Sequence, residues 1–113
     1  MVSRTAFVHA ARLELAEGAD PRAPGGAVTL ALCGAWEHPP ACRWPHQNAL
    51  DDALTPTAFR TVFVAPPDDE ARVRALIVEA LRSGEGWRLV GEEPAALADA
   101  ERALADRLLR PRS

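Results

Sequence analysis

The chain has 113 residues, 48% hydrophobic and 26% charged, which is the composition of an ordinary globular protein with one modest core. Its net charge of −3 lacks the basic excess that attracts nucleic acid or anionic membranes, so we expect neither partner. No apolar run approaches the ~18 residues of a membrane span, and residues 1–9 lack the apolar segment of a signal peptide. We therefore expect a single domain over residues 1–113, located in the cytoplasm. All thirteen basic residues are arginine, a bias typical of GC-rich bacterial genomes.

The first third of the chain predicts two strands joined by a loop. Residues 5–16 alternate in the way of a half-buried strand. The side chains that share its apolar side are Phe7, His9, Ala11, Leu13 and Leu15. Residues 17–26 are rich in glycine and proline and predict a loop, and the apolar run 27–33 predicts a second strand. Because successive strands usually pair, these two should form an antiparallel hairpin.

Residues 33–58 show no sheet or long-helix periodicity and predict an irregular loop. Asn48 fits the N-cap of a short helix through Leu54, which Pro56 would end. A connection of this length in a compact domain is usually functional, or else indicates a wrong assignment of its elements.

The second half of the chain predicts strand, helix, strand and helix. Residues 59–64 and 87–90 have strand composition, and residues 67–83 have a helical apolar stripe that ends near Gly84 or Gly86. The stripe consists of Val73, Leu76, Ile77, Ala80 and Leu81. Glu70 and Arg74 should pair on the solvent side of this helix, since they are four residues apart.

The last predicted helix starts at Pro94 and runs to about Leu109, followed by a frayed tail over residues 110–113. Its buried line is Leu97, Ala100, Leu104 and Leu108. Both long helices have one apolar side, so they should lie on one face of the sheet. The sequence therefore predicts a two-layer α+β fold with a mixed four-stranded sheet, including a parallel crossover over residues 59–90.

The residues that carry chemistry gather between positions 33 and 46. This segment holds both cysteines and two of the three histidines, spaced Cys-x4-His-x3-Cys-x3-His. Its members are Cys33, His38, Cys42 and His46. Two thiolates and two imidazoles complete the tetrahedron that zinc prefers, and a site with four protein ligands is structural. Neighbouring glycine and prolines lower the entropy that the loop loses on ordering.

The second half of the cluster resembles a known type of zinc site. Cys42-x3-His46 has the spacing that closes CCCH-type zinc fingers. The first half matches neither that family nor the CCHC knuckle, whose pattern begins with Cys-x2-Cys. The resemblance covers five residues, and it implies no fold and no RNA binding for this chain.

Other interpretations of the same segment stay open. With three protein ligands, a metal-bound water would fill the fourth place, and Glu37 would be the candidate base. Without a metal, either cysteine could be a nucleophile activated by His38 or His46, or the two cysteines could form a disulfide if the protein were exported. The cluster could also consist of ordinary loop residues. His9 is expected to be a hydrogen-bonded core histidine, with a metal ligand or a base near a thiol as the alternative.

An aromatic and proline-rich surface is the remaining feature of this loop. Trp36, Arg43 and Trp44 could dock a partner protein or a small apolar ligand, or the tryptophans could cap the core beneath the loop. The alanine-rich last helix could pair with a copy of itself in a homodimer. Together these observations predict a small accessory or interaction module with a structural zinc. The alternative is a small enzyme that uses the same loop.

Overall fold

The computed structural model describes residues 3–34 and 43–110. Within these residues, the strands form a single four-stranded sheet in which every neighbouring pair is antiparallel, in the order β2-β3-β1-β4. The strands are β1 (Thr5–Leu15), β2 (His46–Asp51), β3 (Thr57–Ala65) and β4 (Trp87–Ala95). The helices are α1 (Ala23–Cys33), α2 (Glu70–Arg82) and α3 (Arg102–Leu109). The predicted α+β class with a four-stranded sheet is confirmed.

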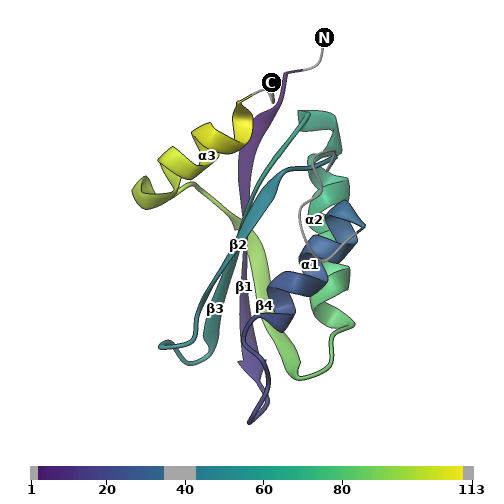
Figure 1. The fold of residues 1–113 in the computed structure, drawn as a ribbon, viewed down its shortest axis with the longest axis vertical. Helices are drawn as coiled ribbons and strands as arrows, with labels where there is room; N and C mark the ends of the chain where they lie inside the picture. Colours follow the sequence, from purple (N-terminus) through teal and green to yellow (C-terminus); the bar gives the residue numbers. More distant parts are fainter. Residues whose placement is uncertain (1–2, 35–42, 111–113) are drawn as a thin grey trace.

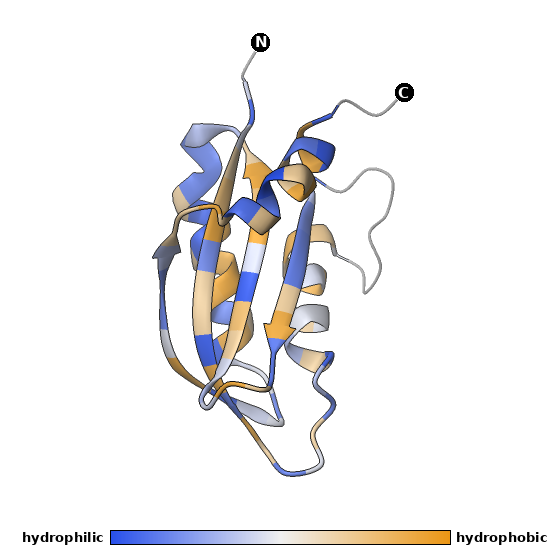
Figure 2. Cartoon of the chain, turned by 90° about the vertical axis from the view of Figure 1, so that its left-hand side faces the viewer, coloured by the Kyte–Doolittle hydropathy of each residue, from blue (hydrophilic) through white to orange (hydrophobic). Residues whose placement is uncertain are grey.

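The helices lie on both faces of the sheet. Figure 1 shows α1 and α2 together on one face and α3 on the other. Successive strand residues point to opposite faces, so Phe63 of β3 packs under α1 and α2 whereas Val62 packs under α3. Figure 2 shows hydrophobic residues along the strands, between the helices that cover the two faces. The prediction that both long helices share one face is therefore wrong: the last helix forms a partial third layer.

The connections differ from the predicted hairpin and mixed sheet. β1 and β2 run parallel with β3 between them, and β3 and β4 run parallel with β1 between them. Helices α1 and α2 thus each link two parallel strands that are separated by a third, an arrangement called split β-α-β. The hairpin of this fold joins β2 to β3, and it does not involve residues 27–33.

Residues 27–33 form most of helix α1, and the predicted strand there is wrong. Pro24 lies in the first turn, and Gly34 ends the helix with a φ of 75°, a conformation that glycine adopts without strain. The buried residues follow a helical spacing at Pro24, Val28 and Leu32. The one polar side chain of residues 27–33, Thr29, is itself buried, so no exposed polar position reveals the period in the sequence.

Residues 46–51 form strand β2, where the sequence predicted a loop and a short helix capped by Asn48. The strand pairs with β3 over its whole length, from His46 opposite Phe63 to Asp51 opposite Ala58. Its inward positions are His46, Asn48 and Leu50. Two of these three are polar, which hides the alternation that identifies a strand.

Helix α2 agrees with its predicted stripe, since Val73, Ile77 and Leu81 are buried. The last helix is shorter than predicted, because β4 continues to Ala95 and one 3-10 turn precedes α3. The apolar residues of α3 pack on the sheet beside Val8 and Val62. The apolar side of α3 is therefore used within the chain.

Helix α3 is attached to the sheet by a two-pronged ion pair. Nε and Nη2 of Arg60 on β3 donate to the two carboxylate oxygens of Glu101 at 2.9 and 2.7 Å, and Nη2 also donates to the Ala96 carbonyl at 2.9 Å. The hydrogen bond from Arg60 holds the pKa of the Glu101 carboxyl below its usual range. The ionised carboxylate therefore stabilises the folded chain.

We expect Glu101→Gln to lower the free energy of unfolding at pH 7 by about 1–2 kcal/mol, because a charge-assisted bond is replaced by a neutral one. A lowered pKa gives stability that is present above the unfolded carboxyl value of about 4.3 and lost as pH falls through the folded value. The difference between wild type and variant should therefore shrink at pH 3. Urea unfolding at both pH values measures it. Glu93→Gln, at an exposed pair with Arg12, is the control and should change little.

Candidate functional site

The end of α1 and the start of β2 bring two of the four predicted zinc ligands together. Cys33 is the last residue of α1 and His46 is the first of β2. The Sγ atom of Cys33 lies 3.8 Å from Nδ1 of His46. His46 is buried, with 2% of its surface exposed. The other two predicted ligands, His38 and Cys42, lie outside the described residues, as do Trp36 and Glu37.

The sulfur of Cys33 is disulfide-bonded in this structure. The disulfide was one of the open alternatives, and in this state the sulfur is not the thiolate that binds a metal. Among residues 3–34 and 43–110, no group of three or more His, Cys, Asp or Glu side chains is arranged to hold a metal ion. A metal at Cys33 therefore requires that the disulfide be reduced first.

His46 is held by a buried chain of hydrogen bonds. Its Nδ1 lies 3.0 Å from the Trp44 carbonyl, which only accepts, so Nδ1 carries the proton. Its Nε2 then accepts from the Thr29 hydroxyl at 3.0 Å. Thr29 accepts from the side-chain amide of Asn48 at 3.2 Å, and Asn48 accepts from the Thr61 hydroxyl at 2.8 Å. Asn48 also donates to the Gly25 carbonyl of α1 at 3.0 Å, and the bonds on both ring nitrogens fix the orientation of His46.

This chain has a consequence for metal binding by His46. The nitrogen nearer to Cys33 is Nδ1, which carries the proton in this structure. To bind a cation there, the ring must change to the tautomer with the proton on Nε2. Thr29 can serve that tautomer as well, because a hydroxyl both donates and accepts. Its oxygen would then accept from Nε2 and orient the ligand, as outer partners of metal-bound histidines do.

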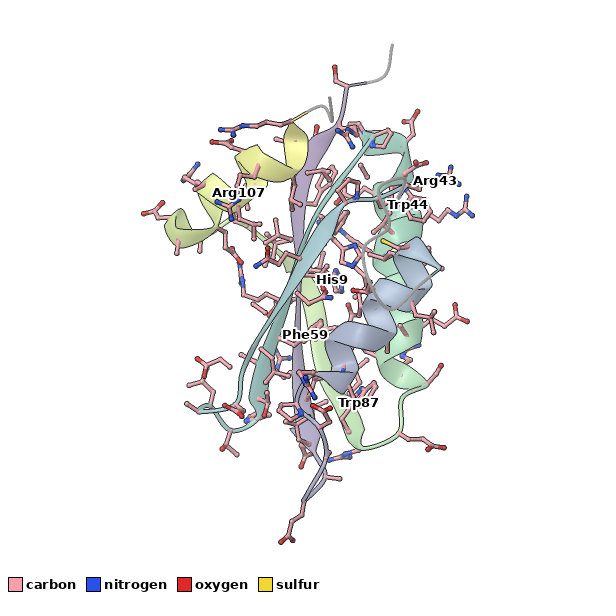
Figure 3. All side chains as sticks on the ribbon, in the orientation of Figure 1. His9, Arg43, Trp44, Phe59, Trp87 and Arg107 are labelled. Carbon is pink, nitrogen blue, oxygen red and sulfur yellow. The ribbon has the colours of Figure 1, made fainter. Side chains whose placement is uncertain are left out.

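Trp44 is a core residue and not part of an exposed aromatic surface. Its side chain is 4% exposed and packs in the core under α1 and α2. Its Nε1 donates to Oδ2 of Asp69 at 3.2 Å, and the guanidinium carbons of Arg43 and Arg72 lie 4.6 and 5.4 Å from the ring centroid. Figure 3 shows Arg43 outside Trp44. The interpretation that this tryptophan caps the core agrees with the structure, and of the two described residues of the expected surface Arg43 is the exposed one.

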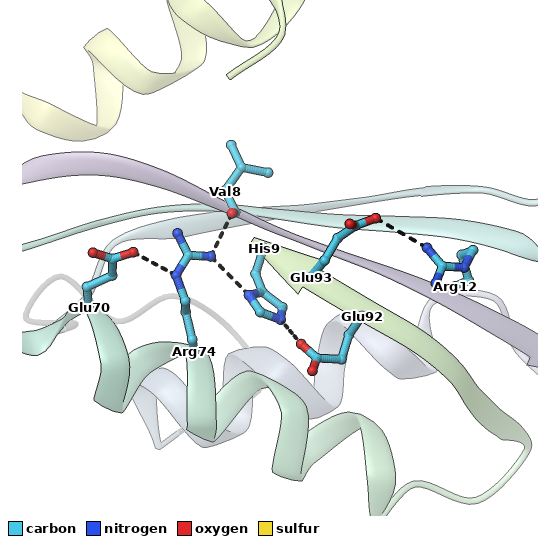
Figure 4. Close-up of polar contacts among 7 residues, drawn as sticks. All are labelled: Val8, His9, Arg12, Glu70, Arg74, Glu92 and Glu93. Atoms are coloured by element: carbon cyan, nitrogen blue, oxygen red, sulfur yellow. Dashed lines mark hydrogen bonds and ion pairs between the residues drawn. The ribbon is translucent and has the colours of Figure 1, made fainter. Parts of the chain in front are cut away.

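His9 is a hydrogen-bonded core histidine, as expected. Its Nε2 donates to a carboxylate oxygen of Glu92 on β4, and its Nδ1 accepts from Nη1 of Arg74 on α2 at 2.9 Å (Figure 4). Arg74 also donates to the Val8 carbonyl at 2.7 Å and to Glu70 at 2.9 Å. Both ring nitrogens of His9 are engaged by these neighbours, so it is neither a metal ligand nor a base for a thiol in this structure.

Sequence reasoning missed four side chains that orient the histidines. Thr29 was assigned to a strand, and Asn48 was interpreted as a helix cap. Arg74 was expected on the solvent side of its helix with Glu70, but its side chain is only 13% exposed and points to the sheet. Glu92 was beyond the predicted end of its strand. The spacing of Glu70 and Arg74 signals their ion pair, and no comparable signal identifies the other contacts.

Comparison with known proteins finds no matching family model, no matching curated protein and no matching solved structure. None of the helices in the described parts of the chain is long and apolar enough to cross a membrane. The geometry of the side chains is therefore the basis for the function proposed below.

We expect Trp44→Ala to lower the free energy of unfolding by about 3–5 kcal/mol, as for other large buried aromatic side chains. Arg43→Ala removes the exposed neighbour on the same ring and should cost about 0.5 kcal/mol or less. Urea unfolding of both variants, with the disulfide intact, measures the difference. Equal small effects in the two variants would contradict a core position for Trp44 and restore an exposed binding surface.

Proposed function

We propose that the protein is a small cytoplasmic zinc-binding module, in which Cys33, His38, Cys42 and His46 hold one structural zinc. The module would serve as an accessory or interaction protein and not as an enzyme. The observation that supports it is the 3.8 Å distance between Sγ of Cys33 and Nδ1 of His46. With zinc–sulfur and zinc–nitrogen bonds of about 2.3 and 2.05 Å and tetrahedral angles, two such ligands of one zinc lie about 3.6 Å apart.

The disulfide and the zinc site are alternative states of the same sulfur. Reduction of a disulfide takes two electrons and two protons and yields two thiols, and zinc displaces the thiol protons when it binds. The thiol pool of the cytoplasm supplies the electrons, since it keeps most protein cysteines reduced. The proposal therefore concerns the reduced protein, in which Cys33 and His46 would start close to their ligand positions.

A closed set of four protein ligands has no position for substrate or water, which is why the proposed zinc is structural. Its effect would be to connect the end of α1 to the start of β2 through the segment between them. In that segment the chain carries both Trp36 and the exposed Arg43. An ordered loop of this kind is a suitable surface for a partner protein or a small apolar ligand.

The same distance also favours a second candidate, a thiol enzyme. With the ring proton of His46 moved to Nε2, the tautomer that metal binding also needs, a reduced Cys33 could give its proton to Nδ1 of His46 and react as a thiolate, because the thiolate is the nucleophile. The geometry places sulfur and nitrogen close enough for this transfer after a small movement. The two candidates differ in what the reduced protein does: it binds zinc tightly in one and is alkylated quickly in the other.

The test of the zinc proposal is the metal content of the reduced protein. Protein purified without added metal and kept under reductant should contain about one zinc per chain, and cobalt should substitute with an absorption band from thiolate ligation. His46→Gln should abolish stoichiometric zinc. His9→Gln is the control: it changes the other buried histidine, which contacts Arg74 and Glu92, and this variant should still bind one zinc per chain.

Thr29→Val tests the orientation of His46. Removal of the hydroxyl should weaken zinc binding by roughly 10–100-fold, measured by competition with a chromophoric chelator. Reduced wild-type protein that is free of zinc and takes up none would contradict the proposal. Rapid alkylation of its thiols at neutral pH would then favour the thiol enzyme.

A further inference from the structure

A groove lies between α2 and the edge strand β4, on the face of the sheet that α1 and α2 cover. Its volume is about 720 Å³. Its apolar lining comes from Ala75, Val78 and Pro94, and its charged lining includes Glu79, Arg82 and Glu92. The groove is therefore partly apolar and partly charged. The carboxylate of Glu92 lies beside His9, which also contacts Arg74.

A β-bulge in β4 turns Glu92 toward this groove. On β1, the neighbouring residues Leu13 and Arg12 pair with Leu89 and Gly91 of β4. Val90 therefore has no partner residue on β1 and is the additional residue of the bulge. In a regular strand, alternation from Leu89 would send Glu92 to the opposite face. The extra residue reverses the alternation beyond it, which places Glu92 on the helix side. Bulges of this kind re-aim side chains and are common beside binding sites.

The hydrogen bonds of His9 make Glu92 an acceptor. Arg74 can only donate, so the nitrogen that it contacts, Nδ1 of His9, accepts, and the ring proton lies on Nε2. Nε2 therefore donates to Glu92, whose side chain is the acceptor of a charge-assisted bond. The other carboxylate oxygen of Glu92 has no hydrogen-bond or ion-pair partner among the described residues, and the side chain is 31% exposed.

The charges around the groove favour a cation. Arg74 is balanced by Glu70, with Nε and Oε2 at 2.9 Å. Glu70 is not part of the lining, but its charge cancels that of Arg74, which is. The other charged side chains of the lining are Glu79, Glu92 and Arg82, so one negative charge is in excess. A ligand with a positive group could use the open oxygen of Glu92 as its acceptor. Its apolar part would then rest on Val78.

We propose that this groove is a binding site for a small organic cation, a primary ammonium carried on an apolar body. Glu92 accepts from the ammonium group, and His9 is a positioning residue that fixes the carboxylate. Ala75, Val78 and Pro94 receive the hydrocarbon. The site shares no ligand with the zinc proposal, so either can fail without the other.

Benzylamine is a suitable probe, with benzyl alcohol and benzoate as neutral and anionic comparators of similar shape. In amide NMR spectra of the full chain, benzylamine should produce saturable shifts at Val78 and Glu92. It should bind about tenfold or more tightly than benzyl alcohol, the factor expected for one charge-assisted bond. Benzoate should bind least.

Glu92→Gln separates charge from structure. Glutamine keeps an acceptor for His9, so the spectrum should otherwise match the wild type, but the preference for benzylamine over benzyl alcohol should disappear. Glu93→Gln is the matched control, because Glu93 lies next in the chain and pairs with Arg12; the preference should persist. Three results would each overturn the proposal and leave His9 and Glu92 as a structural link. The wild type could bind benzylamine and benzyl alcohol equally, benzylamine could produce no saturable shifts, or the preference for benzylamine could survive Glu92→Gln.

Discussion

The buried hydrogen bonds from Thr61 through Asn48 and Thr29 to His46 hold α1 against the sheet in one position. Apolar contacts also bind this helix, but hydrophobic attraction is not directional and permits a helix to slide or rotate. A buried donor or acceptor that loses its partner costs about 1–3 kcal/mol, so displacement of α1 would break several bonds at once. In β2, Leu50 is the one apolar residue among three inward positions. The place of this strand therefore depends on polar contacts more than on burial.

The two histidines described at inward positions of the sheet show the same physical solution in different surroundings. Each ring lies under a helix, with one nitrogen donating and the other accepting. His46 lies under α1 beside the sulfur of Cys33, and His9 lies under α2 beside the carboxylate of Glu92. Satisfied networks of this kind are tolerated in a core and favour one arrangement over others. The two helices of this face are therefore each oriented by one histidine.

Prediction from the sequence was correct where hydrophobic residues recur with the period of the strand or helix that they form. Strand β1 and helix α2 carry clear alternation and a clear stripe, and both form as predicted. It failed at α1, because residues 27–33 are apolar apart from Thr29, which is buried, so no exposed polar position marks the period. It failed at β2, because His46 and Asn48 face inward. Of the predicted zinc ligands, Cys33 and His46 lie together, and the partners that orient His46 come from tertiary contacts that spacing does not encode.

The failures at β2 and β4 coincide with the two candidate sites, and there is a physical reason for this. Apolar residues in place of a histidine together with the polar side chains that bind it would avoid the desolvation of polar groups, and such joint replacements are often neutral or stabilising. The bulge in β4 likewise interrupts ladder bonds to turn a carboxylate inward. Local conflicts with the fold's own pattern are expected at functional positions, since stability alone does not favour them. The inward histidines and Glu92 are for this reason stronger candidates for function than the exposed charges of the sheet.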